Sequence, residues 1–127
     1  MPSTEECLKR IDDVVAAAAD PKAAYLIRSR LRRAILSCAR LVADTHGAPK
    51  PDVPGLFVTP PEAGASDAHV IALCNRIFFS AQELCQPSES FDVRWERGWA
   101  LLRKELDGLR DALVGRTEQA GLRARSS

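Results

Sequence analysis

Apolar residues recur at helical spacing in four separate stretches of the chain. The first stretch follows Ser3 and Glu6, which have the Ser-x-x-Glu spacing of a capping box at a helix start. Its apolar positions repeat every three or four residues, as on one face of an amphipathic helix, and are Cys7, Leu8, Ile11, Val14, Val15 and Ala18. The pattern predicts a first helix over residues 4–19.

The second stretch, residues 21–45, has apolar residues on two sides. Asp20 and Pro21 are typical of a helix start, and His46-Gly47 is typical of a helix end. The main apolar face consists of Ala24, Ile27, Leu31, Ala34, Ile35, Cys38, Leu41 and Val42. A second apolar group lies near the opposite side and consists of Tyr25, Leu36 and Ala43. This helix therefore has more apolar surface than one core contact requires.

The third stretch is expected to be a helix capped by Ser66 and Asp67 and ending before Pro87. Phe79 points almost directly away from the apolar face of this helix, so something besides the main core can cover Phe79. The residues expected to face the core are Val70, Leu73, Cys74, Ile77, Phe78, Ala81, Leu84 and Cys85.

The fourth stretch begins after Ser88 or Ser90 and has the most regular pattern. Gly115 is expected to end its helix, and residues 116–127 are expected to form a flexible basic tail. Trp95 and Trp99 lie one turn apart on the apolar face, so we expect them to pack in the core, with binding through an exposed edge of Trp99 as the alternative. The heptad-like seam consists of Phe91, Trp95, Trp99, Leu102, Leu106, Leu109 and Leu113.

Residues 47–65 separate the second and third helices. This segment holds five of the eight prolines, which excludes a helix, and its triplet Leu56-Phe57-Val58 is expected to pack against the helices. The sequence therefore predicts an all-α four-helix bundle over residues 1–115, made of two antiparallel helical hairpins joined by a long proline-rich crossover. The crossover is long enough to reach either end of the second helix, so the direction of the third helix stays open.

Composition is that of one globular domain, with 127 residues, 46% hydrophobic and 28% charged. The four cysteines include no CxxC pair, so we expect buried free thiols in a reducing compartment and no metal site. The acidic start of the chain is unlike a signal peptide or a mitochondrial presequence, and no apolar run reaches the ~20 residues that span a bilayer. Cytoplasmic or nuclear placement follows by default.

Familiar catalytic constellations are missing from the sequence. The predicted inward faces carry no paired carboxylates, the chain has only two histidines, and no glycine-rich phosphate loop is present. This disfavours an enzyme and indicates no cofactor. A small-ligand pocket between the helices, lined by the cysteines and Phe78, is a further hypothesis that has no polar anchor.

Arg40 and His46 form the one pattern with a catalytic interpretation. Their Arg-x5-His spacing resembles the motif of HEPN-type helical ribonucleases, which implies an arginine and a histidine beside an RNA phosphate, commonly from two subunits. An arginine can steady a phosphate and a histidine can move protons. In the alternative interpretation, His46 is favoured by the helix dipole at the end of the second helix, and Arg40 faces solvent.

Residues 21–50 hold seven basic residues and one acidic residue. A solvated helix, or one paired with the acids of the first helix, explains these charges; contact with nucleic acid through the same arginines is the alternative. Aromatic and apolar residues interleaved with arginine are also typical of protein interfaces. We therefore predict a protein–protein interaction module, either a homodimer or an adaptor subunit, that uses Tyr25, Arg32, Arg33, Leu36, Arg40 and Phe79.

Overall fold

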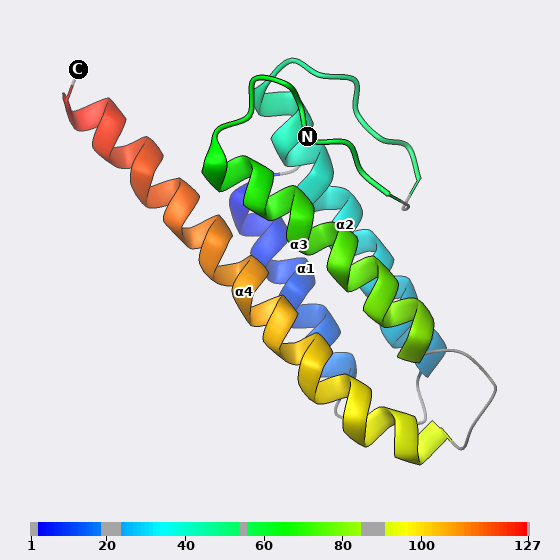
Figure 1. The fold of residues 1–127 in the computed structure, drawn as a ribbon. Coiled ribbons are helices and arrows are strands. Elements are labelled where there is room, and N and C mark those ends of the chain that lie inside the picture. The colour runs from blue at the N-terminus through cyan, green and yellow to red at the C-terminus, as the bar shows by residue number, and fades with distance from the viewer. Residues whose placement is uncertain (1–2, 19–23, 54–55, 85–90, 127) are drawn as a thin grey trace.

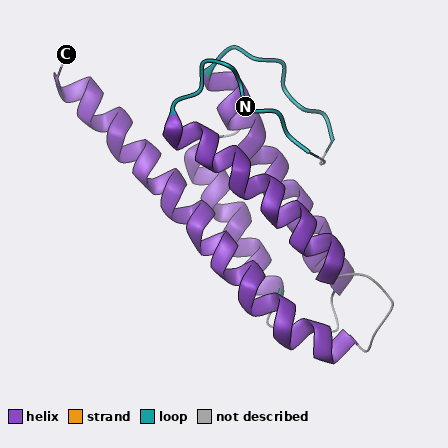
Figure 2. Ribbon diagram, in the orientation of Figure 1, coloured by secondary structure: helices purple, strands orange, loops and turns teal. Residues whose placement is uncertain are grey.

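The computed structural model describes residues 3–18, 24–53, 56–84 and 91–126 of the chain (Figure 1). Within these ranges it contains four helices, and every other segment is a loop or turn (Figure 2). Contacts join α1 to α2, α2 to α3, α3 to α4, and α4 back to α1. The predicted all-α four-helix bundle is therefore confirmed. The helices are α1 (Thr4–Ala17), α2 (Ala24–Thr45), α3 (Ala65–Leu84) and α4 (Phe91–Ser126).

The crossover leaves α2 and enters α3 at the same end of the bundle, and this determines the direction of α3. His46 directly follows α2, Asp67 lies in the first turn of α3, and their side chains are 2.7 Å apart. Helix α3 therefore starts where α2 ends and runs antiparallel to it, and Figure 1 shows α4 running antiparallel to α3 in turn.

The start of α1 and the end of α2 follow the signals in the sequence. Ser3 is the N-cap of α1, and its Oγ accepts a 3.1 Å hydrogen bond from the backbone N–H of Glu6. After α2, Gly47 has a φ of +64°, a conformation that favours glycine because it has no Cβ. Both predicted signals are confirmed, whereas the predicted start of α2 at Pro21 lies outside the described residues.

Helix α4 contributes the most regular part of the core. Leu102, Leu106, Leu109 and Leu113 are fully or almost fully buried, as their heptad-like spacing predicts. Trp99 is half-buried and packs against the same cluster, in agreement with the core interpretation of this residue.

Three predicted helix boundaries are wrong, and the smallest difference is at the end of α1, which is Ala17 with Ala18 as its C-cap. Helix α3 begins at Ala65, so Ser66 and Asp67 lie in its first turn, and the carbonyl of Gly64 accepts the N–H of Ala68. Helix α4 continues through Gly115 to Ser126, and its last turns project away from the other helices (Figure 1). A glycine inside a helix costs only about 1 kcal/mol relative to alanine, and the residues that follow it here are mostly good helix formers. The domain division at residue 115 and the flexibility of the tail stay predictions.

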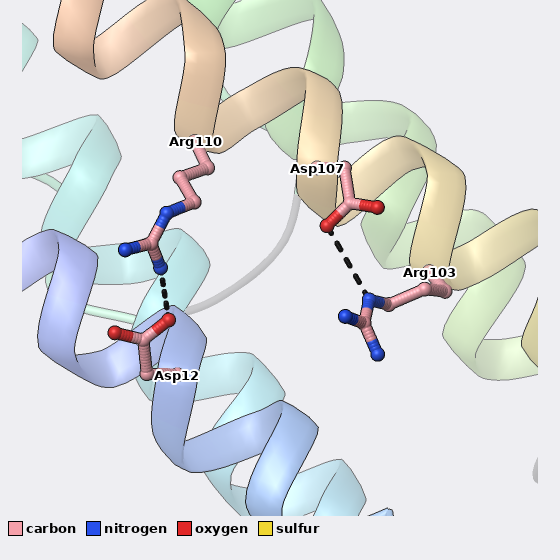
Figure 3. Close-up of polar contacts among 4 residues, drawn as sticks. All are labelled: Asp12, Arg103, Asp107 and Arg110. Atoms are coloured by element: carbon pink, nitrogen blue, oxygen red, sulfur yellow. Dashed lines mark hydrogen bonds and ion pairs between the residues drawn. The ribbon is translucent and has the colours of Figure 1, made fainter.

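Among the described residues, the ion pairs differ from one of the two arrangements that the sequence allows, in which acids of α1 pair with arginines of α2. Asp12 of α1 binds Arg110 of α4, and within α4 Arg103 Nε lies 3.3 Å from Asp107 Oδ1 (Figure 3). Arg30 of α2 does reach α1, but it donates to the backbone carbonyl of Asp13. Exposed pairs of this kind contribute about 0–1 kcal/mol each. The bundle is therefore held mainly by its apolar core.

Candidate functional site

Phe57 anchors the crossover to the bundle. Its side chain is 9% exposed and belongs to the core cluster. Its N–H donates to Oδ1 of Asn75 on α3 (2.8 Å), and its carbonyl accepts from Nδ2 of the same residue (3.1 Å). One amide side chain thus satisfies both backbone groups of Phe57, as a neighbouring β-strand would. The expected packing of the apolar triplet is confirmed for Phe57.

The residues on either side of Phe57 point outward. Leu56 is 66% exposed and Val58 is 88% exposed, because successive side chains of an extended backbone point to opposite sides. The expectation that the whole triplet packs against the helices is wrong for these two residues. Val53, earlier in the crossover, is 70% exposed. The crossover therefore presents a group of apolar side chains to its surroundings, and we call Val53, Leu56 and Val58 the crossover patch.

A hollow of about 440 Å³ lies between the crossover and the helices. Its floor is formed by small or branched apolar residues, Ala39 and Ala43 of α2 and Ile71 of α3. All three members of the crossover patch contribute to its lining. The remaining lining residues are Ala48, Pro49, Lys50, Pro51, Phe57, Thr59, Pro60 and Pro61.

The crossover also explains much of the second apolar side of α2. Ala43 was expected to lie away from the core, yet it is 6% exposed and forms part of the floor of the hollow. Ile71 of α3, also outside its predicted apolar face, is buried in the same way. Leu36 is half-buried and packs against the core cluster. Helix α2 therefore leaves less apolar surface uncovered than its sequence indicates.

The other predicted partner-binding residues remain at the surface where they are described. Arg32 and Arg33 of α2 are exposed, and Phe79 of α3 is 52% exposed. The ring of Phe79 meets that of Phe78 edge-on, with 6.1 Å between the ring centres. The side chain of Tyr25 lies outside the described residues. Among the predicted residues whose side chains are described, Phe79 is thus an exposed aromatic residue.

The candidate catalytic residues Arg40 and His46 contact two different segments of the chain. Arg40 is half-buried, and its Nε donates a 2.8 Å hydrogen bond to the carbonyl of Pro51 in the crossover. The expectation that Arg40 faces solvent is therefore wrong, because it fastens the crossover to α2. His46 instead contacts Asp67, with both side chains largely buried. Asp67 was predicted only as a helix cap, and no spacing in the sequence links it to His46.

Three free cysteines lie buried in the core, one from each of three helices: Cys7 of α1, Cys38 of α2 and Cys74 of α3. A hydrogen bond with Cys38, together with burial, raises the pKa of the Cys7 thiol far above its ordinary value. The hydrogen bond to Cys7 by itself lowers the pKa of Cys38, but Cys74 and burial outweigh it and raise that pKa well above normal. Thiols of this kind stay protonated and are poor nucleophiles. This agrees with their predicted role in packing.

A second, polar hollow of about 260 Å³ lies between α1 and α2. It is lined by Arg10 and Asp13 of α1 and by Arg30 and Arg33 of α2. Among the predicted partner-binding residues whose side chains are described, Arg33 is the one that lines it. The sequence shows the arginines of α2 but gives no sign that Arg10 joins them, because that depends on how the two helices align.

Asn75→Ala tests the anchoring of the crossover. The change removes both hydrogen bonds to the backbone of Phe57, so we expect the free energy of unfolding to fall by about 1–3 kcal/mol. We also expect the Phe57 amide to exchange its hydrogen faster. Urea denaturation and hydrogen exchange measure the two effects. Asn75→Asp is the matched control, because it keeps the acceptor for the Phe57 N–H and should preserve more of the protection. Unchanged exchange in Asn75→Ala would show that the anchor lies elsewhere.

Further features bear on which classes of site the chain can hold. In the described ranges, no three metal-binding side chains come together in a suitable group. No helix in the same ranges is both long and apolar enough to cross a bilayer. Comparisons with protein-family models, with curated proteins and with solved structures find no match to this chain.

Proposed function

We propose that this chain is a helical protein–protein interaction module that forms a homodimer through the crossover patch and the apolar hollow beside it. The observation that carries the proposal is the concentration of exposed apolar side chains in one short segment. Six large apolar residues are exposed in the described part of the chain, and three of them, Val53, Leu56 and Val58, lie within six positions. Single exposed apolar residues are ordinary, whereas a cluster beside an apolar hollow is typical of a binding surface.

A second copy of the chain is the occupant that best suits this surface. In a two-fold symmetric dimer, the same patch on each copy must be complementary to itself. The crossover has both parts that such a contact needs, since protruding side chains such as Val58 lie beside a hollow that can receive the same side chains of the other copy. Fully burying a valine or leucine side chain contributes about 1.5–3 kcal/mol. Two copies of the patch can therefore supply a substantial part of the dimer's stability.

The charges near the hollow are compatible with self-association. Lys50 lines the hollow, and its amine lies 3.0 Å from the carboxylate of Asp44 on α2. Because this lysine already has a partner of opposite charge, two copies can approach without bringing unpaired lysines together. The crossover is also fastened at two points, by Asn75 to Phe57 and by Arg40 to Pro51. A surface held in place in this way loses less conformational freedom on binding.

Light scattering during size-exclusion chromatography tests the proposal. Across a concentration series, the wild-type protein should approach twice its monomer mass of 13.9 kDa. The double variant Leu56→Ser, Val58→Ser should dissociate at concentrations at which the wild type is dimeric. Leu101→Ser is the matched control, because Leu101 is 55% exposed on α4 and lies outside the crossover. A wild-type protein that stays monomeric throughout would reject the homodimer.

The nucleic-acid alternative has less support from the geometry. RNA cleavage by Arg40 and His46 needs both side chains at one phosphate, but Arg40 binds Pro51 and His46 contacts Asp67. We therefore leave that activity out of the proposal. RNA cleavage by the wild-type protein that disappears in both Arg40→Ala and His46→Ala would bring it back.

A further inference from the structure

The polar hollow between α1 and α2 gathers three arginines at one place. Arg10 and Asp13 are three positions apart on α1, and Arg30 and Arg33 are three positions apart on α2. Residues at this spacing lie on the same side of a helix, so each helix directs two side chains to the groove between them. Three guanidinium groups and one carboxylate surround a space of about 260 Å³. The described side chains that line the hollow therefore carry more positive than negative charge.

Much of the hydrogen-bonding capacity of these arginines is unused. Arg10 donates from Nη2 to Glu6 Oε1 at 3.0 Å, and Arg30 donates from Nη1 to the backbone carbonyl of Asp13 at 3.3 Å. Arg33 is exposed and takes part in no ion pair within the described residues. Each guanidinium has five N–H donors, so most of the donors around the hollow have no acceptor among the residues that the structure describes.

Arg10 adds an observation of a different kind. Its Nε is buried, and within the described residues it has no hydrogen-bond partner. A buried donor without an acceptor is unfavourable, and more so when it is charged. Unsatisfied groups of this sort often mark the place of a water or an ion. An anion bound beside Arg10 would supply the acceptor that its Nε lacks among the described residues.

From these contacts we infer that the hollow between α1 and α2 is a binding site for a phosphate group, either as free inorganic phosphate or as a small phosphate monoester. Guanidinium groups bind phosphate through pairs of parallel hydrogen bonds, and a tetrahedral dianion offers oxygens in several directions at once. Arginines reaching it from two helices can therefore share one ligand. The carboxylate of Asp13 repels the anion, so removing its charge should tighten phosphate binding. The site is distinct from the crossover patch.

Titration of the protein with inorganic phosphate tests the site directly. The signals of the arginine Nε–H groups are followed by ¹H–¹⁵N NMR at constant ionic strength, with chloride as the balancing anion. We expect the Arg10 signal to shift and to reach saturation. A shift that grows linearly without saturation, or one that chloride alone reproduces, would overturn the inference.

Two neighbouring arginines provide matched variants. Arg33→Gln removes a charge that lines the hollow and should weaken phosphate binding about tenfold or more, as expected for one charge-assisted hydrogen bond. Arg32→Gln removes the same charge one position away, outside the lining, and should change the affinity by less than about twofold. Equal losses in both variants would reveal general attraction to a basic helix and would overturn the site.

For Asp13→Asn we expect tighter phosphate binding, a result that damage to the fold would not produce. The substitution removes the negative charge that Asp13 contributes to the described lining, so phosphate should bind several-fold more tightly. An unchanged or weaker affinity would contradict the proposed position of the ligand. Comparing inorganic phosphate with phenyl phosphate then separates the two sources: tighter binding of the ester supports a monoester ligand, and equal or weaker binding of the ester supports free phosphate.

Discussion

Leu106→Ala is expected to lower the free energy of unfolding by about 3 kcal/mol, within the range of about 2–5 kcal/mol for buried leucines. Leu106 has 0% exposure and lies in the middle of the α4 seam, where neighbours such as Leu102 and Leu109 are equally buried. The truncation leaves a cavity that a closely packed core cannot readily fill. Urea denaturation followed by circular dichroism measures the change.

Leu101→Ala is the control for this measurement. Leu101 precedes the buried Leu102 on the same helix, but it is 55% exposed. A substitution at such a surface position usually changes stability by less than about 0.5 kcal/mol. Equal losses in Leu101→Ala and Leu106→Ala would mean that the seam does not face the core in the way described.

The second large effect is a loss of stability in alkaline solution. A hydrogen bond with Cys38, together with burial, raises the pKa of Cys7 in the folded protein. The hydrogen bond with Cys7 lowers the pKa of Cys38, but a hydrogen bond with Cys74 and burial outweigh it and raise that pKa, whereas an unfolded cysteine has a pKa of about 8.5. Above this pH the unfolded chain releases thiol protons that the folded chain keeps, so the free energy of unfolding falls as pH rises. Each such thiol contributes about 1.4 kcal/mol per pH unit. Between about pH 8.5 and 10.5, the two together should lower stability by several kcal/mol.

Serine variants separate this effect from the titration of lysine and tyrosine. Cys7→Ser and Cys38→Ser replace the thiol with a hydroxyl, which can form hydrogen bonds but does not titrate in this range. Each variant should have a shallower decline of stability with pH than the wild type, whatever its stability at neutral pH. Urea denaturation at a series of pH values measures the slopes. A slope that is the same in the wild type and in both variants would exclude the cysteines as its cause.

The helices and their core faces could be predicted because both depend on local periodicity. Residues such as Leu106 and Leu109 repeat at a spacing that only a helix places on one face, and Ser3 offers an acceptor where a helix start needs one. The predicted end of α4 at Gly115 is wrong because a glycine ends a helix only when the following chain turns away. Beyond Gly115 the residues favour helix, so the helix continues.

The candidate site at the crossover could not be predicted, because it depends on contacts between segments that are distant in the sequence. The burial of Ala43 and Ile71 follows from the path of the crossover, and a proline-rich loop has no periodicity that reveals its path. Asn75 lies 18 positions from Phe57, and an asparagine on a helix resembles any solvated polar residue. For this reason the sequence indicates α2 as the interaction surface, whereas in the structure a group of exposed apolar residues lies on the crossover beside it.

Disulfide cross-linking through an introduced cysteine tests the central claim, self-association through the crossover, most directly. The described native thiols are buried, and Cys85, which lies outside the described residues, is replaced by serine. In this background Val58→Cys places a thiol at the most exposed position of the patch, and Leu101→Cys places one on α4. After mild oxidation with glutathione disulfide, non-reducing electrophoresis should show a covalent dimer of Val58→Cys that forms much faster than that of Leu101→Cys. Equal rates, or no dimer of Val58→Cys, would contradict a homodimer joined at the crossover.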